Sequence, residues 1–381
     1  MTPQQTTTAS TLRQGGWVVI VALVLCLPVL GWRAVAWWSS QGSGAVGDGR
    51  DPHSYGFVLD PLDVPGDLLV AGGLPREGLR TLDHPSMLSV DQVEQLNPGG
   101  HGGRFMVSGD RVVGLNIGGE ARAYPLHLLQ WYELTNDTVG GIPLLLVYSP
   151  LVDGVAVFRR PLGSDGEPMV FASSGLVHQS EQLAFDRGTE SLWSPLLGAA
   201  IAGPARGIEL ERVPHALVGW GRWKESHPDT VLLARDEAMR KRRKRNPYGS
   251  YFGSDILRFP VRPVPDDGRG RLKQRATVLQ EADDRVVVLH GVVAELLDGQ
   301  ACITLGGEPF VLVHDPVSDT LDLEAGEPDW SAQAFWFAWY ATHPQDRVAS
   351  SGDMDCRARR PSSPVGPRAS RRGAARSGPG G

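Results

Sequence analysis

The stretch LLLVYSPLVDGVAVF, Leu144 to Phe158, consists of two apolar runs that flank a short corner containing Ser-Pro and Asp-Gly. Each run has the length of a buried strand, and the corner residues are typical of turns. The stretch therefore predicts a buried β-hairpin with its tip at Ser149–Gly154. No residue of this tip is an evident catalytic group, so the sequence leaves open what the hairpin presents there.

The whole chain has the composition of an ordinary globular protein. Its 381 residues leave room for two domains, or for one large core with appendages. The 47 glycines and 29 prolines favour many short strands and turns over long helices. The net charge of −6 gives no indication of a nucleic-acid partner. We therefore expect an α+β fold dominated by strands.

The folded body shows a weak internal duplication, because three blocks occur twice in the same order. PLLLVYSP (Pro143–Pro150) resembles PFVLVHDP (Pro309–Pro316), and GWGRWKESHP (Gly219–Pro228) resembles FWFAWYATHP (Phe335–Pro344). RVVGLNIGGEARAYPL, from Arg111, has a shorter echo in RVVVLHGVVAELL, from Arg285. The repeat predicts two related β-rich lobes, residues 53–240 and a shorter lobe at residues 241–350.

Local patterns around these blocks predict further elements. Residues 104–125 are typical of a strand, a Gly-Asp turn and a second strand, and residues 124–137 of a short helix after a proline. Trp220, Trp223 and His227 have the spacing of one helical face that ends at Pro228. Such an aromatic stripe favours a core position, with His227 in a packing or capping role.

Residues 16–38 form an apolar segment with Arg33 and a tryptophan-rich end. We expect an uncleaved signal anchor that spans the membrane once, with Arg33 at the interface. A cleaved secretory signal and a buried core helix are the alternatives. Arg13 and the amino terminus mildly favour residues 1–15 in the cytoplasm and the body outside it. The membrane is therefore one expected partner, and the cell membrane is the expected location.

The segments that flank the body have the composition of unfolded chain. Residues 39–52 are rich in glycine and serine and predict a flexible linker. Residues 351–381 predict a disordered basic tail, which is either a solvated tail, a sequencing artefact or a ligand for anionic polymer or lipid. Cys26, Cys302 and Cys356 are too few for a disulfide framework, so all three are expected to be free thiols.

Three blocks, residues 121–158, 173–204 and 217–233, together with NPYGSYFGSD (Asn246–Asp255) and FWFAWYATHP, resemble the domain of unknown function 3179 family. The resemblance implies a fold more than a function, because the family consists largely of uncharacterised prokaryotic proteins, many of them with a signal or membrane anchor. It also implies a Tyr-Cys-Pro-Leu-Cys sequence at the hairpin tip and a Trp-His-Glu sequence on the preceding helix. Two thiols and an imidazole at such a place suit a soft metal or a redox pair.

This chain departs from that pattern at all three candidate ligands. Ser149 and Val152 stand at the cysteine positions and Tyr132 stands at the histidine position, whereas Glu133 is retained. Serine, valine and tyrosine do not replace the lost donor set, so we expect no metal and no cofactor. The sequence therefore favours a non-catalytic binding or scaffolding protein of the cell envelope, with an unidentified envelope ligand or protein as partner.

A second polar block, Ser174–Ser194, supplies the alternative of an enzyme that works without cysteine. His178 would serve as base or ligand, with Asp186 or Glu190 orienting it, and the enzyme would use His178, Glu133 and Asp186 in a pocket between the hairpin and this block. The competing interpretation makes Asp186 part of a turn and Trp193 a core anchor. The full set of candidate pocket residues is Tyr132, Glu133, Tyr148, Ser149, Val152, Ser174, His178, Asp186 and Glu190.

One strongly basic run interrupts the acidic chain. It consists of Arg240, Lys241, Arg242, Arg243, Lys244 and Arg245. A polyanion patch that grips lipid headgroups, envelope polymers or nucleic acid is one interpretation. A solvated surface loop is favoured, because the run is single and a nucleic-acid partner does not fit the overall charge.

Overall fold

The strand-dominated α+β class predicted from the sequence is confirmed. The computed structural model describes residues 45–97, 104–236, 246–266, 268–354 and 356. These residues contain six short α-helices and 21 strands. The helices are α2 (Val90–Gln95), α3 (Leu126–Leu129), α4 (Trp220–Ser226), α6 (Gly249–Phe252), α7 (His290–Ala294) and α8 (Trp336–Thr342).

One sheet is built on a hairpin of β4 (Arg111–Ile117) and β5 (Glu120–Pro125). Gly118 and Gly119 form its turn, and both adopt the positive φ that glycine tolerates without strain. The sheet continues with β13 (Ala216–Gly219), β14 (Val231–Leu233) and β3 (Met87–Ser89). Its order is β13-β4-β5-β14-β3, and only the β5–β14 pair is parallel.

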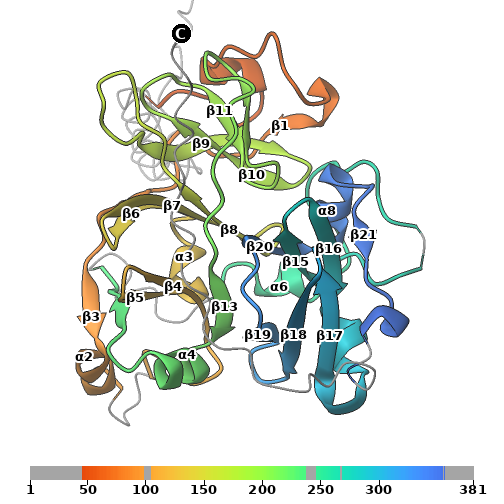
Figure 1. Ribbon diagram of the computed structural model, residues 1–381. Coiled ribbons are helices and arrows are strands. Elements are labelled where there is room, and N and C mark those ends of the chain that lie inside the picture. The colour runs from red at the N-terminus through yellow and green to blue at the C-terminus, as the bar shows by residue number, and fades with distance from the viewer. Residues whose placement is uncertain (1–44, 98–103, 237–245, 267, 355, 357–381) are drawn as a thin grey trace, which may run out of the picture. The chain divides into compact units, whose positions relative to one another are not determined.

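The same connections occur again in the second half of the chain. β15 (Arg275–Glu281) and β16 (Asp284–Leu289) form a hairpin that leads into α7, as β4 and β5 lead into α3. β20 (Trp330–Phe335) pairs antiparallel with β15, and β21 (Arg347–Val348) pairs parallel with β16. Helices α4 and α8 follow β13 and β20 directly, so the two halves share one element order (Figure 1).

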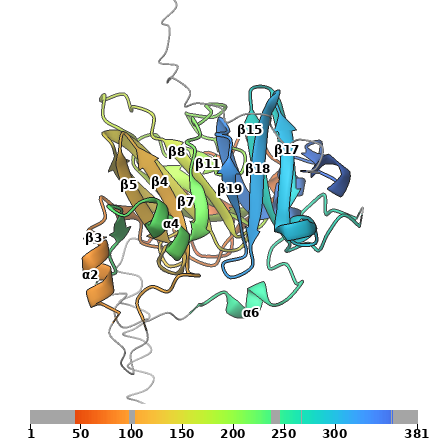
Figure 2. The same ribbon diagram turned by 60° about the horizontal axis from the view of Figure 1, so that its bottom comes forward.

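Each half also contains an antiparallel meander of three strands. The first consists of β6 (Leu134–Val139), β7 (Ile142–Ser149) and β8 (Gly154–Arg159), and β7 and β8 are the hairpin predicted above. The second consists of β17 (Gln300–Leu305), β18 (Glu308–Asp315) and β19 (Thr320–Ala325), which lie side by side in Figure 2. The predicted buried hairpin is therefore confirmed.

The eight-stranded sheet joins the two halves. Its order is β2-β6-β7-β8-β20-β15-β16-β21, where β2 is Leu82–Asp83. The junction is between β8 and β20, with Val155 opposite Gln333. A second connection between the two halves is formed by Arg222 of α4, which makes ion pairs with Asp322 and Glu324 of β19. The last strand of each meander, β8 or β19, therefore contacts the other half of the chain.

A further sheet is formed by β1 and by four strands that are inserted in the chain between β8 and β13. Its strands are β1 (Leu69–Ala71), β9 (Phe171–His178), β10 (Glu181–Asp186), β11 (Leu192–Ser194) and β12 (Ala199–Ala202), in the order β1-β9-β10-β11-β12. In the second half, β19 is followed by β20 after only Gly326–Asp329. The insertion explains why the first half of the body is the longer one.

The predicted aromatic helix is confirmed, with Trp220 and Trp223 buried on α4. His227 follows the last helical residue and its ring stacks on Trp223 at 3.9 Å between centroids, as expected for packing and capping. The indole lies over Gly114, where a Cβ atom would come within 2.4 Å of the Trp223 ring. β4 therefore needs glycine at this position.

Three local predictions are corrected. The helix expected over residues 124–137 ends at Leu129, and Leu134–Val139 is strand β6 because its backbone pairs with β7. The strand expected before the Gly-Asp turn is absent, since residues 104–107 pair with no strand and β4 begins at Arg111. The third repeat block is shifted by one strand, because Arg285 lies in β16 whereas β4 corresponds in the sheet to β15.

The ends of the body extend further than predicted. The compact unit begins at Gly47, within the expected linker, and Asp48 accepts hydrogen bonds from the backbone of Arg50 and Asp51. Ser351–Met354 form a 3-10 helix with Met354 buried, within the expected tail. Cys302 and Cys356 form a disulfide, so the expectation of free thiols at these two positions is wrong.

Several predictions fall on parts of the chain that are not described. The expected anchor at 16–38 and the basic run Arg240–Arg245 lie outside the described residues. Among the residues that are described, none of the helices has the length and apolar character needed to cross a membrane.

Candidate functional site

The tip of the β7–β8 hairpin is buried inside the body. The side chain of Val152 is fully inaccessible to solvent and packs in a core cluster with second-half residues such as Trp336 and Trp339. The backbone N–H of Phe335 donates to the Val152 carbonyl oxygen at 2.6 Å. The hydroxyl of Tyr251 donates to the Leu151 carbonyl oxygen at 2.8 Å. The tip thus joins the two halves of the chain.

The neighbouring candidate residues also have structural contacts. Ser149 is buried, and its hydroxyl accepts the backbone N–H of Gln182 from the inserted sheet at 3.4 Å. Tyr132 is buried at the end of the α3 turn. Tyr148 donates its hydroxyl to Asp153 Oδ1 at 2.9 Å. Tyr132, Ser149 and Val152 are therefore held in the core of the molecule.

Glu133 is the retained member of the family-like sequence, and it is an unusual carboxyl group. Its backbone has a φ of 64°, and its side chain is buried. Oε1 accepts the hydroxyl of Tyr248 at 3.2 Å, whereas Oε2 has no hydrogen-bond partner in the described part of the chain. Burial raises the pKa of Glu133 to about 8, although the Tyr248 hydrogen bond opposes the shift.

His178 lies at the end of β9 and is buried. Neither ring nitrogen has a hydrogen-bond partner among the described residues. Burial lowers the pKa of His178 to about 4, so the imidazole is neutral near pH 7. A neutral imidazole without a hydrogen-bonded carboxylate lacks the orienting group that a general base in a triad uses.

The other polar candidates stabilise the inserted sheet. Asp186 accepts the backbone N–H of Thr189 at 2.5 Å, the Thr189 hydroxyl at 2.6 Å and the Trp193 indole N–H at 2.9 Å. Ser174 donates to the Leu183 carbonyl oxygen at 2.7 Å. Glu190 forms an ion pair with Arg76 at 2.6 Å, with more than half of the Glu190 side chain exposed. These contacts support the structural interpretation of Asp186 and Trp193.

The structure does not bring His178 and Asp186 together. Asp186 pairs with Phe171 at one end of the β9–β10 hairpin, and Glu181 pairs with His178 at the other end. At about 3.3 Å per residue, the length of β9 places the two side chains roughly 23 Å apart. Glu133 contacts Tyr248 instead, so the three proposed catalytic groups form no common site.

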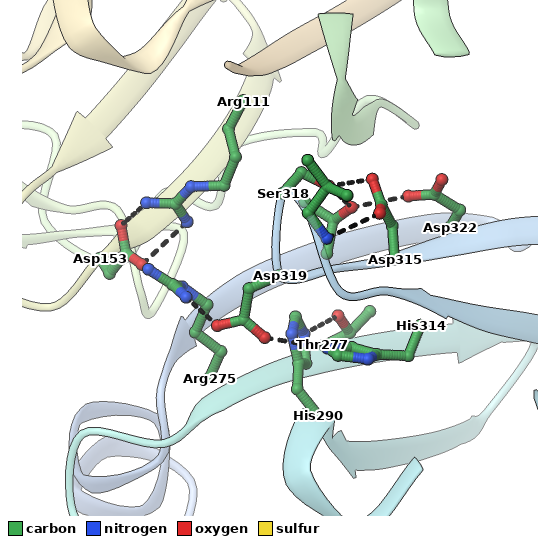
Figure 3. A network of polar contacts seen from close by, with 12 residues as sticks. Arg111, Asp153, Arg275, Thr277, His290, His314, Asp315, Ser318, Asp319 and Asp322 are labelled. Carbon is green, nitrogen blue, oxygen red and sulfur yellow. Dashed lines mark hydrogen bonds and ion pairs between the residues drawn. The ribbon is translucent and has the colours of Figure 1, made fainter. Parts of the chain in front are cut away.

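An ionic network lies beside the tip, between the two halves (Figure 3). The Asp153 side chain is fully buried. It accepts hydrogen bonds from both terminal nitrogens of Arg111, at 2.9 and 3.0 Å, and from Nε of Arg275, at 2.7 Å. Arg275 also contacts Asp319, which in turn pairs with His314 Nε2 at 2.9 Å. Burial would raise the pKa of Asp153, but the charges of Arg111 and Arg275 lower it well below its usual range.

The network repeats one pair of residues at equivalent places in the two halves. Arg111 and Arg275 are the first residues of β4 and β15. Asp153 and Asp319 stand in the β7–β8 and β18–β19 turns, with φ of 43° and 54°. Tyr148 and His314 occupy matching positions before these turns and each contacts the aspartate of its own turn. Arg275 bridges the two pairs.

A second polar chain occupies the β18–β19 turn at the positions that match Ser149 and Val152. Ser318 donates to Asp315 Oδ2 at 2.5 Å and contacts the Thr320 hydroxyl at 2.8 Å, and Thr320 donates to Asp322 at 2.8 Å. Burial raises the pKa of Asp322, and the charge of Arg222 opposes the shift. This turn is therefore polar where the first turn is apolar.

Comparison with known proteins places the chain in one family. The profile described as protein of unknown function (DUF3179) matches residues 76–327, about two thirds of the chain. The chain belongs to the DUF3179 family. No curated protein and no solved structure matches it. The resemblance seen in the sequence blocks is thus confirmed by the family match.

The matched DUF3179 region includes both turns and the ionic network. Within the described residues, no group of three or more His, Cys, Asp or Glu side chains has the arrangement of a metal site. Two carboxyl groups of this region are Asp153, which already binds two guanidinium groups, and Glu133, whose raised pKa favours the neutral acid. Neither offers a free carboxylate to a cation near neutral pH.

Sequence reasoning missed Arg111, Asp153, Arg275 and Asp319. The aligned blocks PLLLVYSP and PFVLVHDP, if continued by three residues, place Asp153 opposite Asp319. That alignment was the available signal for a repeated turn aspartate. Its arginine partners carry no local signal, because each reaches the turn from a strand that is distant in sequence.

Proposed function

We propose that this DUF3179 member is a non-catalytic binding or scaffolding protein of the cell envelope. The observation that carries the proposal is the complete burial of Val152 in a tip that joins the two halves of the body. The family resemblance implies thiols at the positions of Ser149 and Val152 and an imidazole at Tyr132. In this chain the same positions contribute to packing, and the described residues supply no substitute donor set.

The proposed location is the outer side of the cytoplasmic membrane, with residues 16–38 as a single-pass anchor. The disulfide between Cys302 and Cys356 supports it, because such bonds persist in oxidising compartments and are rare in the cytosol. Treatment of intact cells with an added protease tests the orientation. The proposal expects loss of the body from intact cells, and full protection would contradict it.

We also infer that the body consists of two lobes that derive from one duplicated unit. Equivalent hydrogen bonds support this inference in addition to the shared strand order. Trp220 N–H donates to the Asp110 carbonyl oxygen, and Trp336 N–H donates to the Gln274 carbonyl oxygen. Trp223 and Trp339 each stack on a histidine and donate an indole N–H to the residue seven positions later.

An enzyme built on His178, Glu133 and Asp186 has no support in the geometry, because Asp186 lies at the far end of the β9–β10 hairpin. The polyanion patch at Arg240–Arg245 remains a sequence-based alternative, since it lies outside the described residues.

Metal content tests the proposed function. The full-length chain and a Tyr132→His, Ser149→Cys, Val152→Cys variant are dialysed against copper, zinc or iron and then against metal-free buffer. Mass spectrometry then measures bound metal per chain. The proposal expects metal in the triple variant only, since restored thiolates and imidazole supply soft donors. Stoichiometric metal in the native chain would contradict it.

A further inference from the structure

A large cavity opens beside the ionic network, on the side of the second lobe. Its volume is about 710 Å³, within the range of small-molecule sites. Four cationic residues line it at alternating positions of one segment: Arg269, Arg271, Lys273 and Arg275. Phe252, Phe335 and buried His290 form other parts of the wall.

The positive charge of Lys273 is poorly compensated. Its ammonium group donates to the carbonyl oxygens of Tyr251 and Ile256, at 2.7 and 2.8 Å, and lies 3.3 Å from the Tyr251 ring centroid. No carboxylate of the described residues lies within ion-pair distance of it. Arg258 lies over the same ring at 5.0 Å and adds positive charge. The lysine charge is therefore solvated by dipoles but is not neutralised.

The cavity lining carries three carboxylates, Asp255, Asp319 and Glu295, beside its four cations. Arg271 pairs with Asp255 at the exposed rim, and Arg275 pairs with Asp153 and Asp319. Arg269 lies over the Trp336 ring at 5.3 Å. Glu295 is an acidic lining residue on the solvent-exposed side. Burial lowers the pKa of Lys273, with Asp255 opposing and Arg258 adding to the shift, so a bound anion would relieve this strain on its charge.

Comparison of the two lobes indicates that the fold does not require these cations. Gly221 N–H donates to the Ser108 carbonyl oxygen and Phe337 N–H donates to that of Leu272, which aligns the two segments. The alignment places Phe105, Val107 and Gly109 opposite Arg269, Arg271 and Lys273, and only Arg111 opposite Arg275 is also basic. The matching cavity of the first lobe, lined by Arg111 and Tyr148, measures about 190 Å³. Among the described residues, the first-lobe segment thus lacks three of the four cations that line the larger cavity.

His290 adds a hydrogen-bonding group to the cavity wall. It is buried, its Nε2 shares a hydrogen bond with the Thr277 hydroxyl at 2.8 Å, and its Nδ1 forms no hydrogen bond within the described chain. A neutral imidazole and several N–H donors beside guanidinium groups are the chemistry that binds phosphate or carboxylate oxygens.

We propose that this cavity binds a small oxyanion that carries at least two negative charges, with Lys273, Arg269 and Arg271 as its cationic contacts. The inference rests on the proposed binding role and names the class of ligand. Phosphate-bearing and carboxylate-bearing molecules share the required chemistry. Inorganic pyrophosphate and citrate serve as probes that separate these two sources.

Isothermal titration of the full-length protein with each probe tests the proposal. We expect saturable binding of at least one probe, weakened at least tenfold by Lys273→Gln and weakened by rising salt. Lys224→Gln is the matched control, because Lys224 lies in the first lobe and pairs with Glu94 at 2.8 Å. It should change the affinity by less than twofold.

The Arg269→Gln, Arg271→Gln variant guards against a folding defect in Lys273→Gln, since both arginines are exposed. It should weaken binding while the melting temperature stays unchanged. Failure of both probes to bind at millimolar concentration, or equal affinity in both cavity variants and native protein, would overturn the proposal. The metal measurement at the hairpin tip is independent of this result, so the two proposals can fail separately.

Discussion

At the scale of single residues, Asp153 has the most constrained role in the molecule. Its carboxylate is fully buried and compensates guanidinium groups from β4 and β15, which belong to different halves of the chain. A buried carboxylate is tolerated only with such partners, because its desolvation alone is costly. The buried Asp153 carboxylate at the tip of the first hairpin therefore has a structural role.

Replacement of Asp153 tests this role. Asp153→Asn removes the charge but keeps the size, so that Arg111 loses its carboxylate partner and Arg275 keeps only Asp319. We expect the free energy of unfolding to fall by about 3–5 kcal/mol. Asp67→Asn is the control, because its pair with Arg262 has both side chains more than 60% exposed and should contribute at most about 1 kcal/mol. Urea unfolding measures both, and equal effects would contradict the assignment.

Glu133 predicts a dependence of stability on pH. Burial raises its pKa from 4.5 to about 8. Between these values the folded protein keeps a proton that the unfolded chain has released, so the free energy of unfolding falls as pH rises. Glu133→Gln should reduce this fall, by at most about 1.4 kcal/mol per pH unit. Glu181, whose pKa burial also raises to about 8, should leave a residual slope in the variant.

Urea unfolding at intervals between pH 5 and pH 8 measures the slope for native protein and Glu133→Gln. An identical slope in the two proteins would show that Glu133 is ionised throughout this range in the folded state.

At the scale of elements, the sequence predicted those helices and strands that form through interactions within a single segment. The β7–β8 hairpin and helix α4 follow from apolar periodicity and from turn or stop residues within the segment itself. The α3 prediction ran too far, because Leu134–Val139 becomes a strand only through its ladder with β7. The pairing of Cys302 with Cys356 had no local signal, since the fold brings β17 and the end of the body together.

The disulfide gives a prediction at this scale. Cys302 and Cys356 are 54 residues apart, so the bridge restricts a long loop in the unfolded chain. Cys356→Ser should lower the free energy of unfolding by about 2–4 kcal/mol. Reductant should destabilise the native protein and the Cys26→Ser control, and should leave Cys356→Ser unchanged. Loss of stability in Cys356→Ser on reduction would contradict the pairing.

At the scale of the whole molecule, the sequence predicted the strand-dominated class but only part of the candidate site. It identified Tyr132, Ser149 and Val152 as departures from the family pattern, because these positions lie in blocks that resemble the family. It grouped His178 with Asp186 because they are near in sequence, whereas the β9–β10 hairpin carries them to opposite ends. The Arg111–Asp153–Arg275–Asp319 network depends on contacts between the two halves of the chain, which no single segment encodes.

Thiol accessibility tests whether the tip of the β7–β8 hairpin is buried between the two halves of the chain. Val317 lies in the matching β18–β19 turn of the second half of the chain and is 76% exposed, whereas Val152 is fully buried. Val152→Cys and Val317→Cys are each treated with a thiol reagent in the native state, with unmodified protein as background. A buried tip predicts rapid modification of Val317→Cys and protection of Val152→Cys until the protein unfolds. Equal rates in the two native variants would contradict it.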